Sequence, residues 1–268
     1  MQSSSHDPSA PGPAPHEQDT GGVGALVARI VGRDRVDPAA ADAGSPSSRE
    51  RAEFGALSKA LVGSARTAGR GSVLGGGWLV DLLIDTVPRI QVRNLETLRR
   101  QHPGLDRDDL AQALISGAAK ATGTAGAAGG ALAAVQFAAP PTLLTAPVQI
   151  AAETLLVAAI EVKLISELHE VYGMGVAGPA RQRMQAFLIA WTERRGIDPF
   201  APGALRFALG AAAKRSLRKR LMKRVGRNLA TLGPMMSGAV AGSVVNHRET
   251  RRLGEQVRDD LRSRGNSR

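Results

Sequence analysis

Residues 121–160 decide the fold: ATGTAGAAGGALAAVQFAAPPTLLTAPVQIAAETLLVAAI. No charged residue lies between Lys120 and Glu153. The first half is mostly Ala and Gly, the second half is richer in Leu, Ile and Val, and Ala139-Pro140-Pro141 separates them. Because a proline inside a helix removes a hydrogen bond and clashes with the preceding turn, this stretch predicts two helices joined as a hairpin.

An uncharged stretch of this length fits either a protein core or a lipid bilayer. A membrane-spanning helix needs about 20 predominantly apolar residues, and each half of the stretch is about that long. Ala and Gly bury little area, however, and Glu153 would carry a carboxylate into the second helix, which is costly in hydrocarbon. The sequence leaves open a tightly packed helical core and a hairpin inserted in or against a membrane.

Small residues recur at helical spacing in this stretch and again near the C-terminus. Rows of this kind let two helix backbones approach closely, in a protein core as in a membrane. Since Gly costs about 1 kcal/mol relative to Ala inside a helix, several of them in one helix indicate close contacts. The alternative is low-complexity Ala/Gly sequence without a packing role. The predicted packing glycines are Gly117, Gly123, Gly126, Gly130, Gly238 and Gly242.

The remaining segments predict an all-α protein with a single multi-helix domain. Residues 1–47 are rich in Ser, Pro, Ala, Gly and Asp, which predicts a disordered tail with at most a transient helix at Val23–Val31. Residues 48–74 predict an N-terminal helix, capped by Ser47 or Ser48, followed by a flexible Gly-rich connector. Residues 75–262 predict the helical domain itself.

Two helix ends have clear capping signals. Asp106 is a good N-cap, and Asp108 and Asp109 suit the positive end of the helix that follows it. Gly173 after Tyr172 is a natural stop for the helix that begins near Thr145.

The composition excludes several classes of function. The chain has no Cys, so disulfides, thiolate catalysis and Cys-ligated zinc are excluded. Aromatic residues make up 3% of the chain, too few to predict a base-stacking platform. Residues 1–20 lack the apolar segment of a signal peptide, so we expect a cytoplasmic location. No motif predicts a cofactor.

Positive charge is concentrated in the last third of the chain. Residues 1–175 carry a net charge of −3 and residues 176–268 one of +14. Within this third, residues 204–227 predict a basic amphipathic helix, with Leu217, Leu221 and Val225 on the apolar arc. Such a helix is typical of an interfacial helix or a site for an anionic partner; the alternative is the solvated face of a core helix. Its predicted lipid- or partner-binding residues are Arg215, Lys219, Arg220, Lys223, Arg224 and Arg227.

A third kind of site would need side chains from separate segments. Glu153, Glu161, His169 and His247 could serve a hydrolase or a metal enzyme if they met in one pocket. No catalytic motif marks them, and we predict no catalytic or metal-binding residue.

Four segments, in this order, resemble the EcsC protein family. The resemblance covers about residues 75–262. It is carried by Trp78-Leu79-Val80-Asp81 through Val87-Pro88, by Ala118–Gly130, by Glu161–Gly173, and by Leu232–Gly242 followed by Asn246.

The resemblance implies an all-α, membrane-associated accessory protein, because the namesake of the family accompanies the ATPase and membrane subunits of an ABC transporter. It supplies no catalytic residue. We therefore expect a non-enzymatic accessory protein at the cytoplasmic face of the membrane, whose partner is an anionic membrane surface or a membrane-protein complex. Nucleic-acid binding through the same basic face is the alternative, although no recognition motif supports it, and an uncharacterised hydrolase or metal enzyme is the third.

Overall fold

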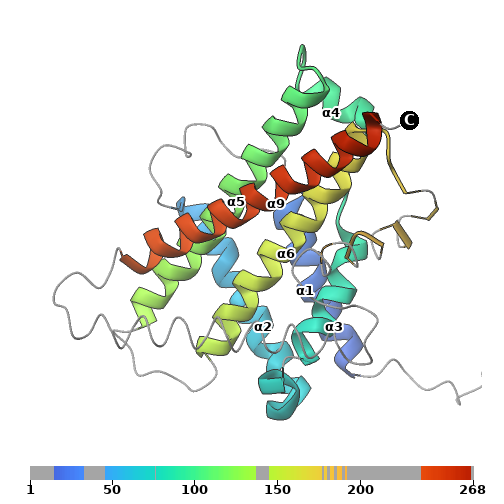
Figure 1. The fold of residues 1–268 in the computed structure, drawn as a ribbon. Coiled ribbons are helices and arrows are strands. Elements are labelled where there is room, and N and C mark those ends of the chain that lie inside the picture. The colour runs from blue at the N-terminus through green and yellow to red at the C-terminus, as the bar shows by residue number, and fades with distance from the viewer. Residues whose placement is uncertain are drawn as a thin grey trace, which may run out of the picture.

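The protein is all-α, as the sequence predicts. The computed structural model describes residues 15–32, 46–75, 77–136, 145–176 and 237–266, together with residues 178–179, 182–183, 186–188 and 191. No strand occurs within these ranges (Figure 1). The helices are α1 (Pro15–Val31), α2 (Ser48–Gly75), α3 (Gly77–Thr86), the short 3-10 helix η2 (Val87–Arg89), α4 (Leu95–Gln101), α5 (Arg107–Gln136), α6 (Thr145–Val171) and α9 (Ser237–Asn266).

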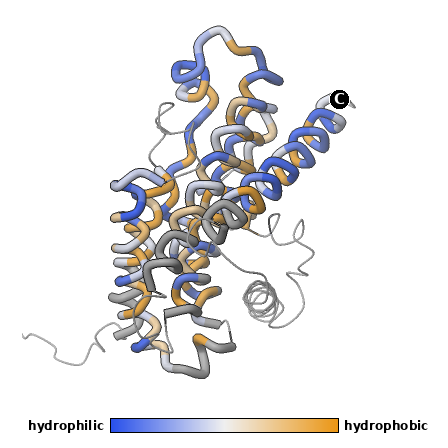
Figure 2. The backbone as a smooth tube through the Cα atoms, turned by 90° about the vertical axis from the view of Figure 1, so that its left-hand side faces the viewer, coloured by the Kyte–Doolittle hydropathy of each residue, from blue (hydrophilic) through white to orange (hydrophobic). Residues whose placement is uncertain are grey.

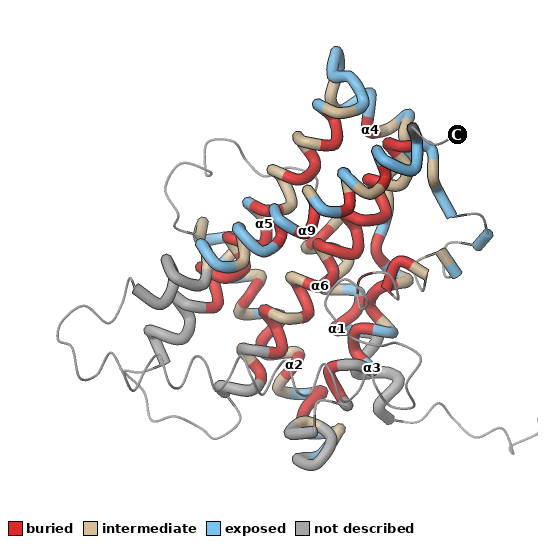
Figure 3. Tube along the Cα trace, viewed as in Figure 1, coloured by how far each residue is buried: buried red, intermediate tan, exposed pale blue. Residues whose placement is uncertain are grey.

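Helix α6 is the centre of the domain. It contacts α1, α2, α3, α4, α5 and α9, and almost all of its described side chains between Val148 and Leu168 are buried or half-buried (Figure 3). As far as Ile160 this follows from its sequence, since a helix that is apolar on nearly all sides must be surrounded. The described parts of the 121–160 stretch therefore lie in the core of the helical domain.

Helices α5 and α6 form the predicted antiparallel hairpin. Near one end of the pair, Gly129 of α5 lies against Glu153 of α6. Near the other end, Tyr172 follows α6 directly, and its hydroxyl donates a 2.7 Å hydrogen bond to Asp108 of α5.

The most extensive partner of α5, however, is α9. The two helices are antiparallel: Gly123 lies against Ser243 and His247, and Arg258 donates a 2.8 Å hydrogen bond to Gln112. Because α5 is antiparallel to both α6 and α9, helices α6 and α9 are parallel to each other. Figure 1 shows α9 lying across α5 and α6, with α1, α2 and α3 on the other side of α6.

Helix α9 is one continuous helix of 30 residues. Polar residues near its middle attach it to α6. Asn246 donates to Glu153 and Thr250 donates to Glu161, so both face the interior of the domain. Charged residues then cover the outer face towards the C-terminus, as the hydropathy colouring shows (Figure 2).

Helix α1 differs from the prediction of a tail with only a transient helix. Its Val23, Val27 and Val31 side chains are buried in the core, and it packs against α2, α3 and α6. At Gly24 the fit is tight, because an added Cβ would lie 2.9 Å from an oxygen of Asp85. Three valines at a spacing of four form only a narrow apolar stripe. Without knowledge of the helices that bury it, this stripe is too weak a signal to predict a packed helix.

The predicted helix ends are present in the structure. Ser47 and Glu50 form a reciprocal capping box at the start of α2, with hydrogen bonds of 3.2 and 2.7 Å. Asp106 accepts from the Asp109 amide at 2.8 Å. At the end of α6, Gly173 has φ 68° and donates to the Glu170 carbonyl, while the next amide donates to His169, which is a Schellman motif.

The Gly-rich connector is a kink within helix α2. Gly69 has φ 78° and ψ 155°, a conformation suited to Gly, and the helix continues beyond it to Gly75. The break thus falls at the first glycine of the predicted connector, while the glycines that follow are helical as far as Gly75.

Candidate functional site

Four ionisable side chains of α6 are buried in the domain. They are Glu153, Glu161, Lys163 and Glu167, with exposed fractions of 4%, 0%, 7% and 2%. A buried charge is costly unless it is paired and hydrogen-bonded, so each must have partners on neighbouring elements. These partners decide whether the carboxylates form a reactive site or hold the helices together.

Glu161 bridges three segments. Its Oε1 accepts a 2.8 Å hydrogen bond from Thr250 of α9, and its Oε2 accepts a 2.8 Å hydrogen bond from the indole N–H of Trp191. Both oxygens of this fully buried carboxylate are thus satisfied by side chains from distant parts of the sequence. The signal in the sequence is Trp191 itself, because a buried indole N–H usually finds an acceptor.

Glu167 forms a bidentate ion pair with Arg93, which lies in the segment between η2 and α4. The two hydrogen bonds measure 2.8 and 2.7 Å, and both side chains are largely buried, at 15% exposed for Arg93 and 3% for Glu167. The Arg93 fork also reaches Gln101 of α4 at 2.7 Å. This pair fixes the position of α4 and of the segment that precedes it.

Lys163 connects α6 to the C-terminal end of α1. Its ammonium group donates to the Val31 carbonyl at 3.2 Å and lies 3.8 Å from Glu167. A lysine at this place satisfies one of the carbonyls that every helix leaves unpaired at its C-terminus. The sequence carries no local signal for this contact, since its two residues are separated by 132 positions.

Glu153 belongs to the contact between α6, α5 and α9. It accepts a 3.0 Å hydrogen bond from Asn246, and one of its oxygens would lie 3.1 Å from a Cβ added to Gly129. Glycine at that position therefore leaves room for the carboxylate.

The residues proposed for a hydrolase or metal enzyme do not meet in one pocket. Glu153, Glu161 and His169 are spaced by eight along α6, which at 1.5 Å per residue places successive groups about 12 Å apart. His247 lies elsewhere, beside Gly123. Within the described ranges, no group of three or more His, Asp or Glu side chains is arranged to hold a metal ion. The described residues thus do not bring Glu153, Glu161, His169 and His247 together in one pocket, as the enzyme hypothesis requires.

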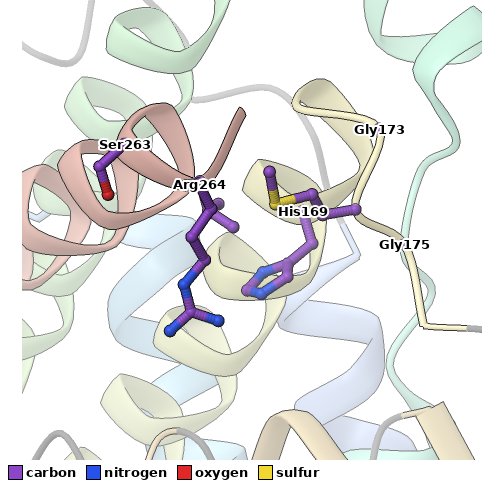
Figure 4. Close-up of a pocket in the computed structure, with 7 residues that line it drawn as sticks. His169, Gly173, Gly175, Ser263 and Arg264 are labelled. Atoms are coloured by element: carbon purple, nitrogen blue, oxygen red, sulfur yellow. The ribbon is translucent and has the colours of Figure 1, made fainter. Parts of the chain in front are cut away.

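An open pocket of about 650 Å³ lies where α6 and α9 end (Figure 4). The Nδ1 atom of His169 is 2.7 Å from the Ile165 carbonyl; since a carbonyl only accepts, Nδ1 carries the proton. The His169 ring also lies 5.0 Å from the ring of Phe187. Arg264 pairs with Asp260 at 3.4 Å, so its charge is shared with α9 itself. The pocket is lined by His169, Gly173, Met174, Gly175, Leu261, Ser263 and Arg264.

Tyr172 anchors the same end of α6 to α5. Burial and the hydrogen bond to Asp108 raise the pKa of Tyr172 from 10.0 to about 12. The Arg107 guanidinium lies 5.2 Å from the centre of the ring, and Arg262 approaches Asp108 at 3.4 Å. The tyrosine therefore stays protonated at neutral pH and acts as a hydrogen-bond donor between two helices.

The predicted packing glycines have different surroundings. An added Cβ at Gly123 would lie 3.2 Å from Ser243 Oγ, whereas one at Gly117 would meet nothing within 4 Å. Among the described residues, the space beside Gly117 is therefore open where the sequence predicts a close helix contact. Gly126 is buried. The surroundings of Gly130, Gly238 and Gly242 lie outside the described residues.

Among the described glycines, the tightest contact is at Gly254, which is not one of the predicted packing glycines. A Cβ added to Gly254 of α9 would lie 2.8 Å from Ile115 and 3.2 Å from Leu164. Gly254 lies in the charged part of α9, without a neighbouring small residue to form a row. Gly254 therefore lacks the row of small residues from which a close helix contact is predicted.

No family model, curated protein or solved structure matches this chain.

The predicted basic face, Arg215 to Arg227, lies outside the described residues. Its charge is nevertheless plain in the sequence. Residues 192–236, between the described Trp191 and the start of α9, contain eleven Lys or Arg and two Asp or Glu, a net charge of +9 out of +11 for the whole chain. Among the described helices, none combines the length and the hydropathy that a membrane crossing requires.

Proposed function

We propose that this protein is a non-enzymatic accessory protein of the EcsC type that associates with an anionic surface at the cytoplasmic face of the membrane. The helical domain serves as a scaffold. The basic segment formed by Arg215, Lys219, Arg220, Lys223, Arg224 and Arg227 binds anionic lipid or an acidic partner, such as a membrane-protein complex.

The observation that supports this proposal most is the distribution of charge. Residues 192–236 carry +9 of the net +11, so the rest of the chain is close to neutral. The buried carboxylates on α6 are engaged by Asn246, Thr250, Trp191 and Arg93. The concentrated positive charge therefore belongs to one segment, while the described acids of α6 hold the helices together.

A segment of this composition is suited to an anionic bilayer. Each Lys or Arg near such a surface contributes about 1 kcal/mol, and the attraction weakens as salt screens it. Six bases acting together give ample affinity for reversible binding. The resemblance to the EcsC family points in the same direction, because its namesake accompanies membrane transport subunits.

The test is vesicle flotation with the full chain at low salt. We expect recovery with vesicles of phosphatidylcholine and phosphatidylserine, little recovery with phosphatidylcholine alone, and release in 0.5 M salt. A variant with Lys219→Gln, Arg220→Gln, Lys223→Gln and Arg224→Gln should lose most of the binding. Equal recovery with both kinds of vesicle would overturn the proposal.

Nucleic-acid binding is separated by a second measurement on the same proteins. If the basic segment serves nucleic acid, a gel shift with duplex DNA will fall steeply with salt, while flotation with phosphatidylserine vesicles will be weak. The location is tested by fractionating cells. An accessory protein held by charge should sediment with membranes and leave them in a carbonate wash.

A further inference from the structure

Helix α9 presents two exposed valines beside two exposed arginines. Val244 and Val245 are 41% and 53% exposed, and Arg248 and Arg252 are also exposed. We call these four residues the α9 docking face.

The four residues share one side of the helix. Residues three, four and seven apart on a helix are neighbours, so Val244 and Val245 lie next to Arg248, and Arg252 lies one turn further on. The opposite side of α9, which includes Thr250, Leu253 and Val257, is buried against α5 and α6. The docking face therefore points away from the domain.

The two arginines of the docking face have no ion-pair or hydrogen-bond partner within the described ranges. Other arginines of α9 do have one. Arg251 pairs with Glu255 at 2.9 Å, and Arg258 pairs with Asp259 at 2.9 Å. The uncompensated positive charge of the helix is thus placed beside its exposed valines.

The docking face also continues the basic segment along the chain. Helix α9 begins at Ser237, directly after residues 192–236 and their net charge of +9. Val244 follows seven residues later, about 10 Å along the helix.

We infer that the α9 docking face, Val244, Val245, Arg248 and Arg252, seats this protein on a bilayer that contains anionic phospholipid. This inference rests on the proposed function and extends it from the basic segment to the folded domain. The arginines lie at the level of the headgroups, and the valines enter the boundary between headgroups and acyl chains. A polyanion in water would gain from the arginines alone, whereas a bilayer also removes the valines from water. This combination of side chains favours lipid over nucleic acid or an acidic protein.

Flotation of full-length variants tests the inference. Arg248→Gln with Arg252→Gln should weaken binding to phosphatidylserine vesicles roughly 30-fold, at about fivefold per base. Val244→Ser with Val245→Ser should weaken it about fivefold through lost apolar contact. The matched control is Lys59→Gln with Arg66→Gln, which removes two exposed cations from α2 and should change binding little. All six substituted residues are exposed, so the circular dichroism spectrum and the Tm of each variant should match those of the wild type.

A fluorescent probe then reports lipid contact directly. The chain has no Cys, so Val245→Cys creates a single site for an environment-sensitive dye. We expect its emission to shift to the blue with phosphatidylserine vesicles and to stay unchanged with duplex DNA. The same dye at Lys59→Cys should not respond to vesicles.

The outcomes separate the inference from the proposed function. If the basic-segment variant loses binding while both α9 variants bind as the wild type does, the docking face is refuted and the proposed function stands. If the wild type binds no anionic vesicle, both fail. If the arginine variant weakens binding to DNA and vesicles alike, and the valine variant and the dye report nothing, the surface serves a soluble polyanion and the inference is overturned.

Discussion

Replacing Arg93 by Met should destabilise the fold, because it breaks the buried ion pair between Arg93 and Glu167 of α6. The substitution removes both hydrogen bonds of the fork, at 2.8 and 2.7 Å. It leaves Glu167, which is 2% exposed, as a buried carboxylate. The partners that remain are weaker: the backbone amide of residue 93 donates to Glu167 at 3.4 Å, and the Lys163 ammonium group lies 3.8 Å away and also donates to the Val31 carbonyl. Breaking a buried pair on one side costs about 3–5 kcal/mol.

The double variant Arg93→Met, Glu167→Leu is the matched control. It removes both charges of the Arg93–Glu167 pair and leaves Lys163 with its hydrogen bond to the Val31 carbonyl; replacing a whole buried pair by apolar side chains is often neutral. We expect it to be within about 1–2 kcal/mol of the wild type, hence several kcal/mol more stable than Arg93→Met alone. Urea unfolding followed by circular dichroism gives the three free energies of unfolding.

The rescue is the decisive comparison. Domains of this kind are stable by about 5–15 kcal/mol, so Arg93→Met alone could unfold the protein at 37 °C. Recovery of the fold in the double variant would then still show that the carboxylate left without its guanidinium partner is the cause. The role of this ion pair is refuted if Arg93→Met costs less than about 1 kcal/mol, or if the double variant is no more stable than Arg93→Met alone.

Three further predictions concern other contacts. Tyr172 is the only tyrosine in the sequence, so a pH titration followed by absorbance at 295 nm should show a single phenol that ionises near its raised pKa of about 12. Asp108→Asn should lower the pKa of Tyr172 towards 10.0 but leave it above that value, because burial is the larger cause of the shift. Since the pKa of Tyr172 is raised in the fold, the contribution of this tyrosine to the free energy of unfolding should be complete below pH 10.0 and vanish as the pH rises through about 12. A midpoint of the absorbance titration at pH 10.0 would show an exposed phenol and contradict this prediction. Gly254→Ala should lower the free energy of unfolding by about 1–2 kcal/mol, because the added methyl group overlaps with the Ile115 side chain. Gly117→Ala should instead raise the free energy of unfolding by up to about 1 kcal/mol, because Ala favours the helix and has room there. Equal effects of the two variants in thermal unfolding would contradict the close contact at Gly254. Lys163→Met should increase hydrogen exchange in α1 more than in α5, and uniform exchange would show that this lysine does not hold the helix.

Local rules of the sequence predict the helices and their ends. The box formed by Ser47 and Glu50, the N-cap Asp106 and the stop at Gly173 all depend on residues within one turn of each other. The hairpin of α5 and α6 follows from the uncharged stretch and its prolines. For the same reason, the charge of residues 192–236 can be read without any structure.

Packing alone decides which helices meet and which polar groups become partners. Helix α1 joins the core because α2, α3 and α6 bury three of its valines, and α9 rather than α6 is the main partner of α5. Glu167 finds Arg93 across 74 residues. Residues so far apart leave no local signal, because a buried carboxylate is stabilised by whichever donor the fold brings within 3 Å, and only the arrangement of all the helices in space determines that donor.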